Sequence, residues 1–180
     1  MTAVNSETLR RELDKLGISA ARLESRGLAR FAEAERLEIA QTDSDGRKHR
    51  LTPAAAAAWR RLQRAAKEDG IDVFVASAFR GIERQIRIIR RKLDSGQSLE
   101  DILAVNAPPG YSEHHTGRAV DIGTPNEPLL ELSFADTPAY AWLQRRGAEF
   151  GFALSYPEGN ESGYQYEPWH WCHHAERTAS

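Results

Sequence analysis

Two short stretches of the sequence contain side chains of the kinds that bind catalytic metal ions. Residues 112–121 read Ser-Glu-His-His-Thr-Gly-Arg-Ala-Val-Asp, and residues 167–170 read Glu-Pro-Trp-His. A catalytic zinc site uses three nitrogen or oxygen ligands from the protein and leaves a fourth position for water. His114, Asp121 and His170 would supply those three ligands. The two stretches therefore predict one bound zinc ion, and a metallopeptidase is the first hypothesis.

Glu167, three residues before the last of these ligands, has the chemistry of a general base. Such a carboxylate takes a proton from the attacking water and later passes it to the leaving amine. On a regular strand Glu167 and His170 would point to opposite faces, because side chains alternate. We therefore expect Pro168 to mark a bend that brings both to one site. Gly117 gives the backbone the freedom to fold the first two ligands inward.

The other histidines at these two stretches and the single cysteine have simpler interpretations. A lone histidine in a loop is more often a hydrogen-bonded structural residue than a ligand, so His115, His173 and His174 are assigned no metal. Cys172 is expected to be a small buried hydrophobic residue, although a thiolate ligand stays open. A closed structural zinc site is a further alternative, and His115, Cys172 or His174 would have to supply its fourth ligand.

Length and composition indicate one globular domain. The chain has 180 residues, of which 41% are hydrophobic and 28% charged, with a formal net charge of -2. The basic cluster within residues 84–92 falls on a helical pattern whose other side is apolar, which favours a solvated face over a polyanion site. We expect no nucleic-acid partner and a monomer.

The N-terminus and the cysteine count bear on the compartment. Residues 1–7 lack a charged region followed by an apolar one, and no stretch approaches a membrane span. One cysteine excludes an intramolecular disulfide and fits a reducing compartment. The expected location is therefore cytoplasmic, although an exported protein whose leader had been removed would look the same.

Hydrophobic periodicity and turn signals predict the elements that must position these residues. Expected helices cover residues 7–16, 53–69, 82–93, 99–105 and 138–150, and expected strands cover 36–40, 71–78, 118–123, 152–156 and 168–173. The strand at 71–78 is almost continuously apolar, which predicts burial on both faces. Gln85 points to the core side of its helix and needs hydrogen-bond partners there. The pattern predicts an α+β fold with helices packed on a small, mainly antiparallel sheet.

Five blocks in the same order resemble the VanY-type D-alanyl-D-alanine carboxypeptidases. They are residues 77–80 with Gln85, residues 109–122, Trp142-Leu143, residues 150–152 and residues 163–170. The blocks span about residues 71 to 173, so we expect residues 1–180 to form one domain with a catalytic core at 71–174 and an N-terminal helical and strand extension at 1–70. The resemblance implies the fold shared by lysostaphin-type peptidases, these carboxypeptidases and the hedgehog signalling domain, with zinc in a cleft.

The resemblance also implies roles for individual residues. His114, Asp121 and His170 match the zinc ligands and Glu167 matches the catalytic base. Arg80 matches the arginine that contacts substrate and steadies the oxyanion, whereas Ser112, Gln85 and Ser77 match residues that hold the substrate's terminal carboxylate. From spacing alone neither Arg80 nor Gln85 would have a catalytic role.

The resulting hypothesis is a bacterial zinc carboxypeptidase that removes C-terminal D-alanine from peptidoglycan stem peptides or muropeptides, by L,D or D,D cleavage. A cytoplasmic enzyme would act on wall precursors or recycled muropeptides, which favours L,D trimming. The alternatives are a non-catalytic zinc- or peptidoglycan-binding module and an endopeptidase that cuts within the stem peptide. Ser155 and residues 172–174 depart from the family pattern and leave the exact substrate open.

Overall fold

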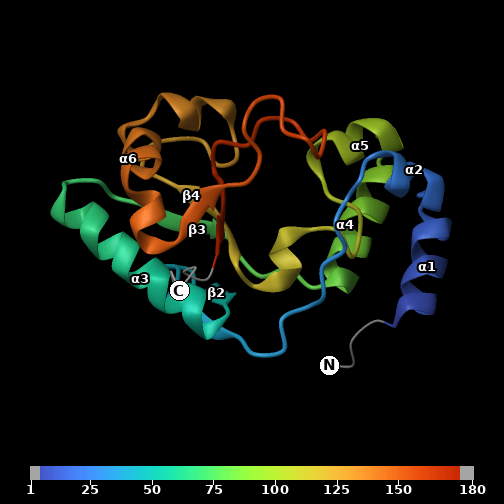
Figure 1. Ribbon diagram of the computed structural model, residues 1–180, viewed down its shortest axis with the longest axis horizontal. Coiled ribbons are helices and arrows are strands. Elements are labelled where there is room, and N and C mark those ends of the chain that lie inside the picture. Colours follow the sequence, from blue (N-terminus) through green and yellow to red (C-terminus); the bar gives the residue numbers. More distant parts are fainter. Residues whose placement is uncertain (1–4, 175–180) are drawn as a thin grey trace, which may run out of the picture.

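The computed structural model, which describes residues 5–174, has a sheet lobe and a helical lobe side by side (Figure 1). The expected α+β architecture with an antiparallel sheet is confirmed. Within the described residues, no helix combines the length and the apolar composition needed to span a bilayer.

The sheet lobe is built on four antiparallel strands in the spatial order β3-β4-β6-β5. These are β3 (Phe74–Ser77), β4 (Ala119–Gly123), β6 (His170–His173) and β5 (Phe152–Leu154). The helices α3 (Pro53–Glu68) and α6 (Pro138–Arg146) and the hairpin of β1 (Glu38–Thr42) and β2 (Lys48–Leu51) complete this lobe. Three short 3-10 helices, η1 (Glu113–Thr116), η2 (Leu132–Asp136) and η3 (Gly147–Phe150), lie in its connections.

Alternation along the central strand β4 separates the core from the site. Val120 and Ile122 belong to the main hydrophobic cluster with Trp59 of α3. Because neighbouring side chains of a strand point to opposite faces, Asp121 projects from the other face. On β6, Trp171 enters the same cluster and His170 takes the Asp121 side. The strand pattern thus delivers a carboxylate and an imidazole to one face.

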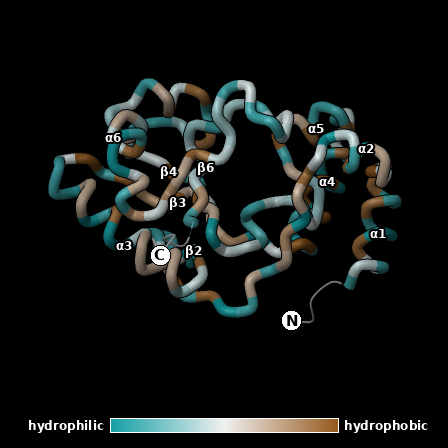
Figure 2. The backbone as a smooth tube through the Cα atoms, in the orientation of Figure 1, coloured by the Kyte–Doolittle hydropathy of each residue, from teal (hydrophilic) through white to brown (hydrophobic). Residues whose placement is uncertain are grey.

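The helical lobe contains α1 (Ser6–Lys15), α2 (Ala20–Ser25), α4 (Ile82–Asp94) and α5 (Leu99–Val105). Their apolar faces form a second cluster, whose buried members include Leu13, Ile89 and Ile102. Brown, hydrophobic segments of the backbone accordingly occur both on the strands and within these helices (Figure 2). Ser98 caps α5 as expected, accepting a hydrogen bond from the backbone N–H of Asp101 at 3.1 Å.

Several elements differ from those expected. The strand expected at 71–78 begins at Phe74 and is not buried on both faces, because its side chains other than Val75 keep partial exposure. The last strand begins at His170, after a turn over Pro168 and Trp169. Neither β2 nor α2 was expected, since each is short.

The N-terminal 70 residues contribute to both lobes. Helix α3 supplies Trp59 and Leu62 to the main hydrophobic cluster, whereas α1 supplies Leu9 and Leu13 to the cluster around α4. The intervening segment hydrogen-bonds the loop before β4, through Phe31 N–H to the Gly110 carbonyl at 2.8 Å.

Candidate metal centre

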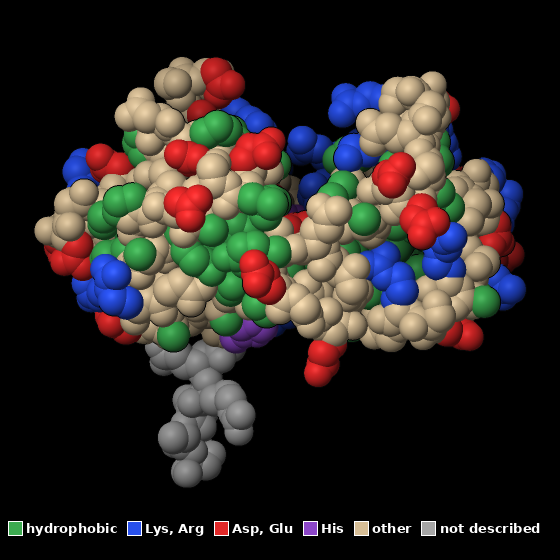
Figure 3. Space-filling model, turned by 90° about the horizontal axis from the view of Figure 1, so that it is seen from above, with side chains coloured by type: hydrophobic (Ala, Val, Ile, Leu, Met, Phe, Trp, Pro, Cys, Tyr) green, Lys and Arg blue, Asp and Glu red, His purple; other side chains and the backbone are tan. Residues whose placement is uncertain are grey.

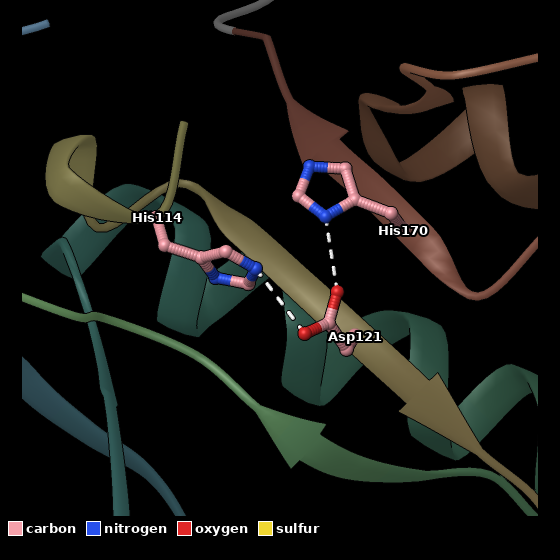
Figure 4. A group of neighbouring side chains, drawn as sticks. All are labelled: His114, Asp121 and His170. Carbon is pink, nitrogen blue, oxygen red and sulfur yellow. Dashed lines mark hydrogen bonds and ion pairs between the residues drawn. The ribbon is translucent and has the colours of Figure 1, made fainter. Parts of the chain in front are cut away.

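Three buried side chains converge on one point of the sheet. His114 comes from η1, Asp121 from β4 and His170 from β6 (Figure 4). His114 Nε2 lies 3.2 Å from Asp121 Oδ2, and His170 Nδ1 lies 3.0 Å from Asp121 Oδ1. Asp121 and His170 are register partners on adjacent antiparallel strands, which explains their contact. The three residues of the predicted ligand set therefore meet in space.

The three side chains fit a divalent metal such as zinc. One ligand atom from each lies within 4.8 Å of the others, and all three residues are buried. Zinc takes imidazole nitrogen and carboxylate oxygen at about 2.0–2.2 Å, and three ligand atoms gathered this closely could be shared by one ion. Among the described residues no fourth group joins this cluster, as an open, catalytic type of site requires.

Charge within the cluster is balanced by close pairing. Burial disfavours the charged imidazole of His170, but hydrogen bonds with Asp121 and Glu113 outweigh burial and raise its pKa to about 10. Burial would raise the pKa of Asp121, yet the two neighbouring histidines hold it well below its usual range. A metal takes imidazole in its neutral form, so metal binding here would displace protons from the ligands.

Glu167 lies beside the cluster without joining it. The turn at Pro168, in which His170 N–H donates to the Glu167 carbonyl at 3.0 Å, brings Glu167 Oε2 to 3.8 Å from His170 Nδ1. The bend expected from the sequence is therefore present. Burial raises the pKa of Glu167 to about 7, and the nearby Asp121 also raises it. A carboxylate with a pKa near neutrality is suited to proton transfer.

Arg80 and Ser112 lie in the same cleft as the cluster. The cleft has a volume of about 470 Å³, and both residues line it together with Glu167. Arg80 Nη2 lies 3.4 Å from Ser112 Oγ, and the buried Nε of Arg80 has no partner among the described residues.

His115 Nδ1 donates to the Arg80 carbonyl at 2.5 Å while its Nε2 accepts from Gly110 N–H at 3.1 Å, so this histidine is structural, as expected.

Gln85 and Ser77 do not line this cleft. Gln85 is fully buried, and its Nε2 donates to the carbonyl of Ala107 at 2.6 Å. Its Oε1 has no partner within the described part of the chain. Ser77 lines a different cavity of about 520 Å³, beside β2 and the start of α4. A register irregularity between Val75 and Ser77 accompanies this placement. Both residues were expected to hold the terminal carboxylate of the substrate. Neither lines the cleft in which that carboxylate would lie.

Three residues at the site were missed from the sequence. Lys92 of α4 lines the cleft, is half-buried and has no ion-pair partner among residues 5–174. The ring of Tyr156 lies 4.7 Å from that of His170. Glu113 Oε2 lies 3.0 Å from His170 Nε2. Of the three, only Glu113 could have been suspected from the sequence, because it directly precedes the predicted ligand His114.

The remaining thiol and imidazole groups stay outside the cluster. Cys172 is buried, and burial raises the pKa of its thiol to about 12, which disfavours a thiolate ligand. His173 is buried against Phe152, with ring centroids 5.2 Å apart, and His174 is exposed.

Comparisons with known proteins agree with this geometry. The family model for VanY D-alanyl-D-alanine carboxypeptidases matches residues 48–176, a match that begins ahead of residue 71. The protein YodJ of Bacillus subtilis (strain 168) is 33% identical over 126 residues, which are 68% of this chain and 46% of that protein. The chain spans about half the length of the first curated relatives it matches.

Two solved structures are similar in fold. The LdcB LD-carboxypeptidase aligns with a TM-score of 0.72 at 28% identity, over 81% of this chain and 71% of that one. A mutant of the vancomycin-resistance D,D-pentapeptidase VanY, solved with Zn(II), aligns with a TM-score of 0.59 at 29% identity, over 77% and 79%. Because the family model covers well over half of the sequence, the chain belongs to the VanY D-alanyl-D-alanine carboxypeptidase family.

Proposed function

We propose that this protein is a zinc-dependent carboxypeptidase that removes a C-terminal D-alanine from peptidoglycan stem peptides. The observation that carries the proposal is the set of three buried ligand atoms beside the Glu167 carboxylate, in one cleft with Arg80. Family membership and the LD- and D,D-specific relatives support the substrate class. Both L,D and D,D cleavage are compatible with this support.

His114, Asp121 and His170 would hold the metal. A zinc ion bound there would supply Lewis acidity and lower the pKa of water to about 7. Glu167 would accept the proton of the attacking water and deliver it to the amine of the departing D-alanine. Because Glu167 is not one of the three ligands, its carboxylate remains available for that transfer.

The cleft has the charge layout that a peptide with a free carboxylate needs. Asp121 and Glu167 lie at its metal end, and Arg80 and Lys92 are the cations that line it. Burial lowers the pKa of the Lys92 ammonium, and repulsion from Arg80 lowers it further. Seen from above, the molecule is hollowed between its lobes and Lys and Arg side chains line one side of the hollow (Figure 3). We assign Arg80 to the developing oxyanion and Lys92 to the terminal carboxylate.

The test is incubation of zinc-loaded protein with a tetrapeptide and a pentapeptide stem, with assay of free D-alanine. Release from either peptide is expected, and the preferred one defines L,D or D,D specificity. Mass spectrometry of digested muropeptides separates terminal from internal cleavage, so internal fragments would identify an endopeptidase. Binding without any cleavage would identify a non-catalytic module and contradict the proposal.

A further inference from the structure

Glu113 contacts the metal cluster at His170 but lies outside the lining of the substrate cleft. Its Oε2 lies 3.0 Å from His170 Nε2, while the other ring nitrogen of His170 faces Asp121. Glu113 does not line the cleft, but a separate cavity of about 320 Å³ that Ser155 also lines. Its side chain therefore contacts the cluster at His170, while its backbone adjoins His114.

Glu113 is held in place by its own contacts. Ser155 Oγ donates a hydrogen bond to the same Oε2 at 2.6 Å, and the side chain is 17% exposed. The carboxylate thus accepts two hydrogen bonds from groups on β6 and just after β5.

We propose that Glu113 is a positioning residue that fixes the tautomer and the ring orientation of His170 for metal binding. An imidazole that donates one N–H to a carboxylate keeps its proton there and presents the other nitrogen as the ligand. Here Glu113 holds the proton on Nε2, so Nδ1 is the nitrogen turned to Asp121 and His114. This inference rests on the metal site in the proposed function but does not depend on the substrate.

Ser155 extends the same chain of contacts. Its hydroxyl orients the carboxylate that orients His170, so we expect Ser155→Ala to weaken zinc binding less than loss of Glu113. The order of contacts from the metal outward is His170, Glu113 and Ser155. Removing a partner of this kind typically lowers metal affinity by about 10–100-fold.

The test measures zinc affinity without any peptide, by competition with a chromophoric chelator. Glu113→Ala should raise the zinc Kd by about 10–100-fold. Glu113→Gln, which keeps an oxygen acceptor but loses the charge, should give a smaller increase. Glu161→Gln, which changes an exposed glutamate outside the cluster, is the matched control and should bind zinc like the wild type.

A spectroscopic measurement separates positioning from a general role in stability. In zinc-loaded wild type, nitrogen-15 NMR should show the His170 proton on Nε2, and Glu113→Ala should lose that protected N–H signal. If Glu113→Ala does not fold, Glu113→Gln decides the question. Wild-type zinc affinity in the folded Glu113 variants would overturn the inference. Absence of zinc binding by the wild type would instead contradict the metal centre, and the inference with it.

Discussion

Glu167 is the residue whose side chain must move protons for the proposed reaction to proceed. Its carboxylate is buried beside the ligands but is not one of them. Glu167→Gln should therefore reduce kcat by about 100–10,000-fold, because the amide cannot accept the proton. The zinc Kd should remain within a few-fold of the wild-type value. A steady-state assay of D-alanine release measures kcat, and a zinc titration measures the zinc Kd. Turnover by Glu167→Gln at the wild-type rate would exclude Glu167 as the general base.

Lys92 lines the cleft and is the residue to which we assign recognition of the terminal carboxylate. If its ammonium pairs with the terminal carboxylate, Lys92→Gln should raise KM for a peptide acid by about tenfold, which corresponds to about 1.4 kcal/mol. A peptide with an amidated C-terminus lacks the charge and serves as the matched substrate. The KM for that amidated peptide should be the same in the wild type and in Lys92→Gln. An equal loss for acid and amide would show that Lys92 does not recognise the carboxylate.

The sequence predicted residues whose chemical type and spacing both indicate a metal site. It did not predict contacts between residues that are far apart in the chain. The ligands His114, Asp121 and His170 could be predicted to meet because motif and strand pattern agree. Glu113 was passed over because its partners Ser155 and His170 lie 42 and 57 residues away in the chain. Periodicity places a side chain on a face but does not identify the cavity it lines.

Ser77 illustrates the same limit at the level of elements. It was expected in the substrate pocket, but β3 has an irregular register at that point and Ser77 lines the cavity beside β2. Local irregularities of this kind depend on pairing with a strand distant in sequence. The long helices α3 and α4, with strong periodicity, were by contrast predicted to within a few residues.

The turn between η1 and β4 depends on Gly117. Its φ is 63°, and a Cβ there would lie 2.8 Å from Leu37 Cδ2 and 3.1 Å from Ala34 Cβ. Gly117→Ala should therefore lower the free energy of unfolding by about 1–3 kcal/mol, from backbone strain together with the clash. Gly159 has a φ of 68° with nothing within 4 Å of its would-be Cβ, so Gly159→Ala controls for strain alone. Urea unfolding should rank Gly117→Ala as the less stable variant, and equal stability would exclude a role for the close packing.

The β1–β2 hairpin should give a measurable pH dependence of stability. Asp43 Oδ2 lies 2.7 Å from Nε2 of the buried His49, and this hydrogen bond lowers the pKa of Asp43. A carboxylate with a depressed folded pKa stabilises the protein above its unfolded pKa of about 3.9, and that contribution is lost as the pH falls through the folded pKa. Asp43→Asn should cost about 1 kcal/mol at neutral pH.

That cost should shrink as the pH falls below about 4, because the wild-type carboxyl is then protonated. Urea unfolding of wild type and Asp43→Asn across this range measures the difference. Asp45→Asn changes a carboxylate in the same turn that hydrogen-bonds Arg47 N–H instead of His49, and serves as the control. A constant difference at all pH values would show that ionisation of Asp43 is not involved.

At the scale of the whole molecule, the site lies where the two lobes meet. The sheet lobe supplies the metal ligands, and α4 of the helical lobe supplies Lys92. Hydrogen bonds join the helical lobe to the loop before β6, among them Gln165 N–H to the Ala104 carbonyl at 3.2 Å and Arg26 Nη2 to the Ser162 carbonyl at 3.0 Å. The N-terminal segment is thereby part of the architecture around the cleft.

The central claim is that one metal ion, held by His114, Asp121 and His170, is required for removal of terminal D-alanine. The most direct measurement adds zinc stepwise to metal-free protein and records D-alanine release from a stem peptide at each step. Release should rise in proportion to added zinc and level off at about one equivalent per chain, because three protein ligands and one open position define a single site. Release that is independent of added zinc, or no release from either tetrapeptide or pentapeptide at saturation, would contradict the account.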